Sequence, residues 1–170
     1  DLGAAAALPA DAPASFFTAQ VGTVQETEIL SVDMDQVLPL GWSATGLWHL
    51  SSVCAPGGTP CAGARWAYYG QDATCNFVTS SPSTTNAGTL PSPPVQLPAA
   101  VPGGTVRLSY CSALQTENAA SYDIATVLVN GVEVERAAES AAWELREVDL
   151  SAYAGQVVTV SFKFDSVDGV

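Results

Sequence analysis

Two carboxylates in the second half of the chain, Glu117 and Asp123, have the residue types and the spacing of metal ligands. Only the connection Asn-Ala-Ala-Ser-Tyr separates them, so both could face one ion while Asn118 or a backbone carbonyl adds a further oxygen. Oxygen ligands of this kind suit calcium better than transition metals. The pair therefore predicts a structural calcium site, and the alternative is that both side chains are solvated surface acids.

Further acidic side chains near both ends of the sequence are candidates for the same site. They are Glu26, Glu28, Asp33 and Asp35 near the start, and Asp165 and Asp168 near the end. A carboxylate pair can also hydrolyse glycosides, with one carboxyl as the acid and the other as the nucleophile across a sugar-binding cleft. Because the sequence shows no insertion that would build such a cleft, calcium binding is favoured over catalysis.

His49 is the only histidine, and Ser51 and Ser52 follow it closely. A Ser-His-Asp triad is possible by composition, but no Gly-x-Ser-x-Gly turn and no oxyanion-hole motif accompanies these residues. A partly buried histidine beside the core residue Trp48 is the simpler interpretation. We therefore expect no enzymatic activity, with a small secreted hydrolase as an alternative.

Aromatic side chains give the chain a second candidate chemistry, the binding of sugars. Three of the four tryptophans lie in apolar stretches, and we expect them to be buried between sheets. An exposed aromatic platform stacks on the apolar faces of sugars while polar neighbours bond their hydroxyls. The candidates for such a platform are Tyr68, Tyr69 and Trp143. A carbohydrate-binding module is therefore an alternative function.

Four cysteines in a Gly- and Pro-rich chain indicate disulfide bonds and export from the cell. Three pairings are possible. The turn-forming Ala-Pro-Gly-Gly-Thr-Pro between Cys54 and Cys61 favours a small loop closed by these two, which leaves Cys75 to pair with Cys111. A zinc site is the competing interpretation, but the chain has no Cys-x-x-Cys pair. We expect an extracellular, periplasmic or cell-surface location.

Composition and charge indicate a folded and strongly acidic chain. Its 170 residues are enough for one well-packed core, and 48% hydrophobic against 13% charged residues exclude a disordered chain. Seventeen acidic and five basic residues give a net charge of −12, which repels nucleic acids and anionic lipid surfaces. We therefore expect neither nucleic-acid binding nor direct membrane insertion, whereas divalent cations are attracted.

Short apolar and polar alternations between Gly- and Pro-rich turns predict an all-β chain. We expect an extended Ala/Pro-rich arm or linker over residues 1–20 and a single β-sandwich domain over 21–170. Asn130-Gly131 predicts a tight hairpin, and the stretch 135–143 is expected to be a loop or a single helical turn. Strands are predicted over 23–35, 106–111, 122–129 and 157–164. This pattern favours an antiparallel two-sheet sandwich.

Several short motifs, taken in order along the chain, match one known family. They are an acidic opening strand leading into Leu38-Pro39-Leu40-Gly41-Trp42, then Leu47-Trp48-His49, Trp66-Ala67-Tyr68-Tyr69-Gly70, Gly88-Thr89-Leu90-Pro91-Ser92-Pro93, Val127-Leu128-Val129-Asn130-Gly131 and Leu150-Ser151-Ala152-Tyr153-Ala154-Gly155-Gln156. With these motifs the chain resembles the MAM-like jelly-roll domains, named for meprin, A5 protein and receptor phosphatase mu. Such domains accompany secreted bacterial peptidases and surface proteins.

The resemblance implies a two-sheet jelly roll, often with a structural calcium ion, that serves adhesion, substrate targeting or domain spacing rather than catalysis. Glu117 and Asp123 occupy positions that match acidic residues of the family's calcium site, and Asp168 is a partial substitute for aspartates absent here. Such domains usually continue past the position of Val170 into a final strand, which is expected beyond this sequence or from another segment. The expected partners are other protein subunits or domains of the same assembly, with glycans as the alternative.

Overall fold

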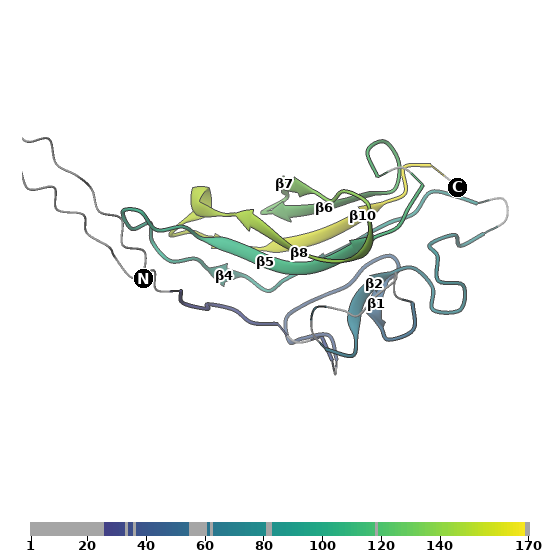
Figure 1. The fold of residues 1–170 in the computed structure, drawn as a ribbon, viewed down its shortest axis with the longest axis horizontal. Helices are drawn as coiled ribbons and strands as arrows, with labels where there is room; N and C mark the ends of the chain where they lie inside the picture. Colours follow the sequence, from purple (N-terminus) through teal and green to yellow (C-terminus); the bar gives the residue numbers. More distant parts are fainter. Residues whose placement is uncertain are drawn as a thin grey trace, which may run out of the picture.

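The computed structural model describes residues 26–32, 34–35, 37–54, 61, 63–80, 83–117 and 119–168 (Figure 1). It is all-β with antiparallel sheets, as the sequence predicted, and its strands are divided among several small sheets. Within the described residues, no helix has the length and apolar character needed to cross a membrane. The predicted arm over 1–20 lies outside them.

The largest sheet contains four strands in the order β3, β10, β6, β7. Their bounds are β3 (Ala87–Pro91), β6 (Ile124–Val129), β7 (Val132–Arg136) and β10 (Val160–Asp165). All but one residue of β6 is apolar, which suits a strand that is paired on both sides. The hairpin at Asn130-Gly131 is confirmed, since both residues have the positive φ, 52° and 82°, that a tight hairpin turn requires.

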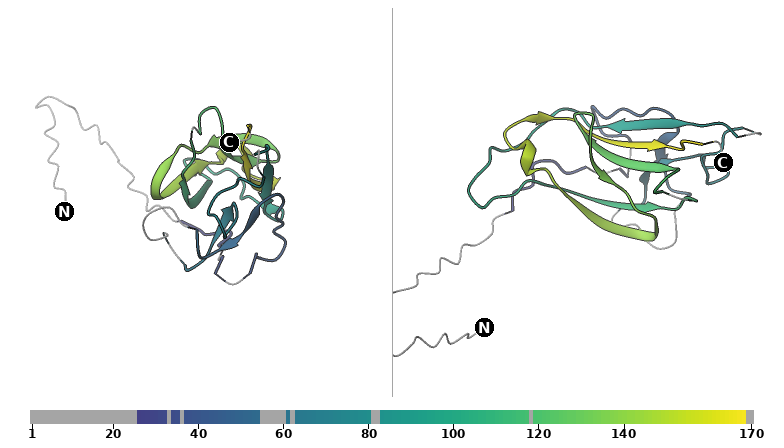
Figure 2. Two further views of the ribbon diagram at one scale, coloured as in Figure 1. Left: turned by 90° about the vertical axis from the view of Figure 1, so that its right-hand side faces the viewer. Right: turned by 90° about the horizontal axis from the view of Figure 1, so that it is seen from above.

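Three strand pairs and one 3-10 turn complete the described fold. They are β1 (Trp48–Ser51) with β2 (Trp66–Tyr69), β4 (Val95–Gln96) with β9 (Val157–Val158), β5 (Arg107–Leu114) with β8 (Ser140–Asp149), and η1 (Ser151–Tyr153). Figure 1 shows β5 and β8 alongside the four-stranded sheet, with the β1–β2 pair below the long strands. Seen from above, the long strands run along the length of the molecule (Figure 2).

The hydrophobic core lies between the four-stranded sheet and the β5–β8 pair. Val127 and Val129 of β6 are almost fully buried, together with Val160 of β10. On the opposite side Val148 of β8 joins this cluster, and Leu108 of β5 packs against it. Burying one such side chain contributes about 1.5–3 kcal/mol, so these alternating inward faces stabilise the contact between the two layers.

A second, aromatic cluster joins the β1–β2 pair to the end of β10. The ring of Phe164 stacks on Tyr69 with 4.5 Å between the centroids and lies 5.0 Å from Phe77. Trp48 of β1 meets Tyr69 edge to face at 5.4 Å. The burial expected for Trp48 is confirmed only in part, because its side chain is half-buried.

Local strand predictions hold where the alternation is regular, and they fail at two places. The strand predicted over 23–35 does not form in the described part of that stretch, where Glu26 instead pairs with Arg107. The stretch 135–143, expected to be a loop or a helical turn, contributes to β7 and β8, because pairing with β6 and β5 outweighs the weak helix propensity of a short segment. The strands predicted over 106–111, 122–129 and 157–164 are confirmed to within a few residues by β5, β6, β9 and β10.

Both disulfides differ from the predicted pairing, because nearness along the chain does not decide which cysteines meet. After β2, residues 71–76 turn back toward β1, and Asp72 accepts a hydrogen bond of 2.7 Å from the Ser51 hydroxyl. This turn places Cys75 against the segment that follows β1. The bonds formed are Cys54–Cys75 and Cys61–Cys111.

Candidate metal centre

Asp123 lies where the loop after β5 enters β6. Its side chain is 1% exposed, and its backbone has a φ of 54°, a conformation that aspartate adopts more readily than most residues. Its N–H donates to the carbonyl of Ser166 over 3.3 Å. Ser166 in turn donates its N–H to the Asn86 carbonyl and accepts the Asn86 N–H at its hydroxyl, each over 3.0 Å. The loop before β6 is thereby joined to the start of β3 and the end of β10.

The Asp123 carboxylate is only partly satisfied by hydrogen bonds. Oδ2 accepts the Glu117 N–H over 3.5 Å, whereas the buried Oδ1 has no hydrogen-bond partner among the described residues. Burial raises the pKa of the Asp123 carboxyl, and the charges of Asp168, Glu117 and Glu139 raise it further, against the lowering effect of the Glu117 N–H. An ionised Asp123 is therefore a buried anion among other anions.

These features fit a calcium ion. A buried carboxylate oxygen that no donor reaches is costly unless a cation compensates it. Asp123, Glu117 and Asp168 are the residues that would hold the ion, with backbone carbonyls as further oxygen ligands. In the described part of the chain no three Asp, Glu, His or Cys side chains already form a metal-binding group. Binding would therefore require the exposed Glu117 and half-buried Asp168 to rotate toward Asp123.

Glu139 belongs to the same acidic surroundings, although the sequence did not indicate it. Its Oε1 accepts the Ala119 N–H over 2.9 Å and the Thr116 hydroxyl over 3.3 Å. Glu139 thereby fixes the loop that precedes Asp123. It lies in the stretch between β7 and β8, and no signal in the sequence places that stretch beside the loop after β5.

Glu28 is exposed, and the other acidic candidates have other contacts or lie outside the described residues. Glu26 forms its ion pair with an arginine of β5, and Asp165 accepts the Lys163 ammonium at 2.9 Å. Asp35 accepts two backbone N–H groups from residues 64 and 65. Asp33 lies outside the described residues.

The aromatic residues predicted to bind sugars are engaged in packing. Tyr69 is 8% exposed, and its hydroxyl is hydrogen-bonded. Tyr68 meets His49 edge to face at 5.6 Å, and Trp143 meets Trp66 in the same manner at 5.7 Å. These positions favour a packing role for all three candidates over an exposed stacking platform.

The ring of His49 contacts an aspartate that also binds Ser51. Its Nε2 lies 3.1 Å from Oδ1 of Asp72, the same oxygen that accepts the Ser51 hydroxyl. A nucleophilic serine bonds to the histidine and reaches substrate, whereas Ser51 bonds to the aspartate and is 1% exposed. The hydrogen bonds from Ser51 and then His49 lower the pKa of Asp72, so its charge persists and fixes the turn that carries Cys75.

Comparison with known proteins identifies no relative. Searches of protein-family models, curated protein sequences and solved structures found no match to the chain. The function of the protein is therefore inferred from its own residues.

Proposed function

We propose that the chain is a non-catalytic extracellular module for adhesion or assembly, stabilised by a structural calcium ion and acting within a larger protein or complex. The observation that carries this proposal is the Asp123 carboxylate, which is 1% exposed, has an oxygen without a donor among the described residues, and has further carboxylates around it. The resemblance to MAM-like domains, and with it the two-sheet jelly roll, belongs to the same proposal.

A calcium ion at this place would act on the fold rather than on a substrate. It would offset the repulsion among Asp123, Asp168 and Glu117 and hold the loop before β6 against the end of β10. An ion that binds only the folded chain stabilises it by RT ln(1 + [L]/Kd), about 2.7 kcal/mol at a concentration of 100 Kd. Such an ion would keep an extracellular surface rigid enough to dock.

The surroundings of the carboxylates and of the serine support a non-catalytic role. A general acid or a nucleophile must reach its substrate, and the buried Asp123 and Ser51 do not present their reactive atoms to solvent. Neither Asp123 nor Ser51 lines the two surface depressions of about 310 and 470 Å³ in the described part of the chain.

Two disulfides indicate an oxidising, extracellular environment. A module in that environment meets the other domains or subunits of its own assembly, and these are the partners that we propose. Its negative surface makes cationic or neutral partner surfaces the favourable ones.

Thermal unfolding in calcium and in excess chelator tests the metal centre. We expect chelator to lower the Tm of the wild type and to leave Asp123→Asn unchanged, because that variant keeps the shape of the side chain without its charge. Glu147→Gln removes an equal charge from the exposed face of β8 and is the matched control, which should respond to calcium as the wild type does. Equal Tm values of the wild type in calcium and chelator would remove the calcium ion from the proposal.

A screen of glycosidic and ester substrates tests the non-catalytic role. We expect no turnover above that of the buffer. Hydrolysis by the wild type that is lost in Glu117→Gln would show that the carboxylates are catalytic, and would overturn the proposal in favour of a secreted hydrolase.

A further inference from the structure

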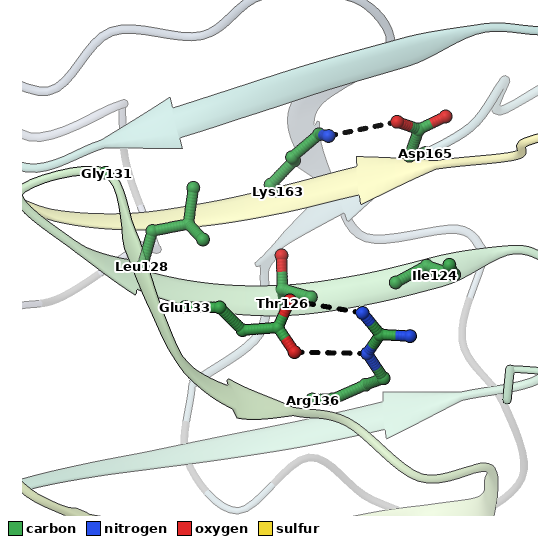
Figure 3. A pocket seen from close by; sticks show the side chains of 8 residues that line it. All are labelled: Ile124, Thr126, Leu128, Gly131, Glu133, Arg136, Lys163 and Asp165. Carbon is green, nitrogen blue, oxygen red and sulfur yellow. Dashed lines mark hydrogen bonds and ion pairs between the residues drawn. The ribbon is translucent and has the colours of Figure 1, made fainter.

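A depression of about 310 Å³ lies on the outer face of the four-stranded sheet, away from the core (Figure 3). Its floor is β6, and its two sides are β7 and β10. A volume of this size is at the lower end of small-ligand sites, which range over about 300–1,000 Å³. Three paired strands form most of it, and Gly131 of the hairpin turn between β6 and β7 completes its lining.

Two ion pairs occupy opposite sides of the depression. On β7, Arg136 donates from Nε and Nη2 to the two carboxylate oxygens of Glu133 over 3.1 and 3.2 Å. On β10, the Lys163 ammonium lies 2.9 Å from Oδ2 of Asp165. The bond to Glu133 raises the pKa of Arg136, and the bond from Lys163 lowers the pKa of Asp165. Arg136 and Asp165 therefore stay charged around neutral pH, each beside its ion-pair partner.

Apolar groups and one hydroxyl line the floor between these pairs. Figure 3 shows Ile124 and Leu128 of β6 on either side of Thr126, with the ion pairs beyond them. Residues at alternate positions of a strand share one face, which is why these three point outward together while Val127 and Val129 enter the core. The depression thus combines aliphatic contact surface with fixed donors and acceptors.

The charges of the depression differ from those of the whole chain. Two of the five basic side chains lie here, each beside one acidic partner, so the four formal charges sum to zero on a protein of net charge −12. The overall negative field repels an anionic ligand, whereas it does not repel a neutral one. Hydroxyl groups match the site, since each can donate to Glu133 or Asp165 and accept from Arg136 or Lys163.

We propose that this depression on β6, β7 and β10 binds a neutral oligosaccharide. Separate sugar rings place their C–H faces on Ile124 and on Leu128, which are four residues apart on β6, and the sugar hydroxyls bond to the two ion pairs. This site goes beyond the proposed function, because it uses neither the acidic cluster at Asp123 nor the aromatic residues that the sequence indicated. Neutral oligosaccharides are then the class of ligand that the proposed adhesion module binds.

A protein partner fits this face less well. A specific protein interface buries about 800 Å² on each partner and is centred on aromatic or aliphatic anchors in a dehydrated patch. Here four charged side chains, 35–44% exposed, flank only two aliphatic ones. A small polyhydroxylated ligand makes use of the charged pairs, whereas a protein core would have to dehydrate them.

NMR titration of the ¹³C-methyl-labelled chain in calcium tests this site. The probes are neutral hexasaccharides of glucose, mannose, xylose and N-acetylglucosamine, with an oligogalacturonate and a mixed-charge peptide for comparison. We expect at least one neutral sugar to shift the methyl resonances of Ile124 and Leu128 in a saturable manner. We also expect Arg136→Gln and Lys163→Gln to weaken its binding by about tenfold or more, since each leaves a ligand hydroxyl or a carboxylate unpaired.

Arg107→Gln is the matched control, because Arg107 is also ion-paired and 43% exposed but lies on β5. It should leave the sugar affinity within about twofold of the wild-type value, as expected for a charge that does not contact the ligand. Shifts caused only by oligogalacturonate or only by the peptide, no shift with any neutral sugar, or equal weakening by Arg107→Gln would each overturn the proposal. The outcome is separable from the metal centre, which is read from the Tm and not from these resonances.

Discussion

Asp123 is a buried carboxyl whose raised pKa makes its contribution to stability depend on pH. In the folded chain, burial and then neighbouring carboxylates raise this pKa above its usual value of 3.8. Between the usual and the raised value, the folded chain keeps a proton that the unfolded chain releases. Without calcium, the contribution of Asp123 to stability therefore falls as the pH rises through that window, and it stays lost above the raised pKa.

Calcium should restore the stability that ionisation of Asp123 removes, and protons should compete with it. We expect the Tm difference between calcium and chelator to be largest near pH 7 and to shrink as the pH falls through the raised pKa of Asp123, because protonation of Asp123 displaces the ion. Thermal melts across this range measure the difference. In Asp123→Asn it should be absent at every pH, and a calcium effect that persists there would place the ion elsewhere.

Arg146 of β8 is a second residue with an identifiable energetic role. Its side chain is 16% exposed and lies 3.8 Å from the Glu135 carboxylate of β7. It also donates to the Ser112 hydroxyl over 2.9 Å and to the Ala138 carbonyl over 3.1 Å. The Tyr110 hydroxyl donates to Glu135 over 2.7 Å, and burial followed by this bond raises the pKa of Tyr110. These contacts among Arg146, Glu135 and Tyr110 link β5, β7 and β8.

Removing Arg146 should leave the partly buried Glu135 carboxylate, which is 21% exposed, without its cation. We expect Arg146→Ala to lower the free energy of unfolding by about 2 kcal/mol, measured by urea denaturation, because a partly buried ion pair and its hydrogen bonds are lost. Arg107→Ala, which breaks ion pairs at an exposed position, should cost less than about 1 kcal/mol. Equal effects of the two substitutions would show that the Arg146 network adds nothing beyond a surface ion pair.

The region around the β1–β2 pair carries two disulfides, which differ in the length of chain that they enclose. Cys61–Cys111 spans 50 residues and reaches β5, whereas Cys54–Cys75 spans 21 residues within the same layer. In the chain-entropy account, replacing both cysteines of a bond by serine costs about 4 kcal/mol for the longer loop and about 3 kcal/mol for the shorter one. Urea unfolding of the two double variants measures this order, and the reverse order would contradict it.

Strands with regular alternation were predictable because their pattern depends on local contacts. β6, β10 and the Asn130-Gly131 hairpin follow directly from apolar spacing and turn chemistry. The disulfide pairing was not predictable, since it depends on a turn at 71–76 that bends back onto β1. Pairing partners for β7 and β8 likewise come from distant strands, so the weak helical signal over 135–143 was misleading.

Within the candidate site, only the contact between residues that are close in the sequence was predictable. Glu117 and Asp123 are close in the chain, and the Glu117 N–H does meet the Asp123 carboxylate. Glu139 approaches from another segment, and no local pattern indicates it. The depression on the outer face was missed for a similar reason, because Arg136 and Lys163 are brought to one face by the strand order β10, β6, β7.

The molecule as a whole has a net charge of −12 on 170 residues, so mutual repulsion opposes its compact state. Sodium chloride screens that repulsion at every exposed carboxylate, since the Debye length falls from about 10 Å at 0.1 M to about 3 Å at 1 M. Calcium at a bound site acts differently, because it is held by a few carboxylates at one place. The stabilisation by calcium therefore depends on Asp123, whereas the stabilisation by sodium chloride does not.

We expect sodium chloride, raised at constant pH in chelator, to increase the Tm of the wild type and of Asp123→Asn by the same amount. Each kcal/mol of relieved repulsion corresponds to roughly 2 to 4 °C for a chain of this size. Calcium added at matched ionic strength should then raise the Tm of the wild type alone, while magnesium, which releases its bound water reluctantly, should do so less. If Asp123→Asn gains as much from calcium as the wild type does, divalent screening of the whole surface explains the effect and the bound ion does not.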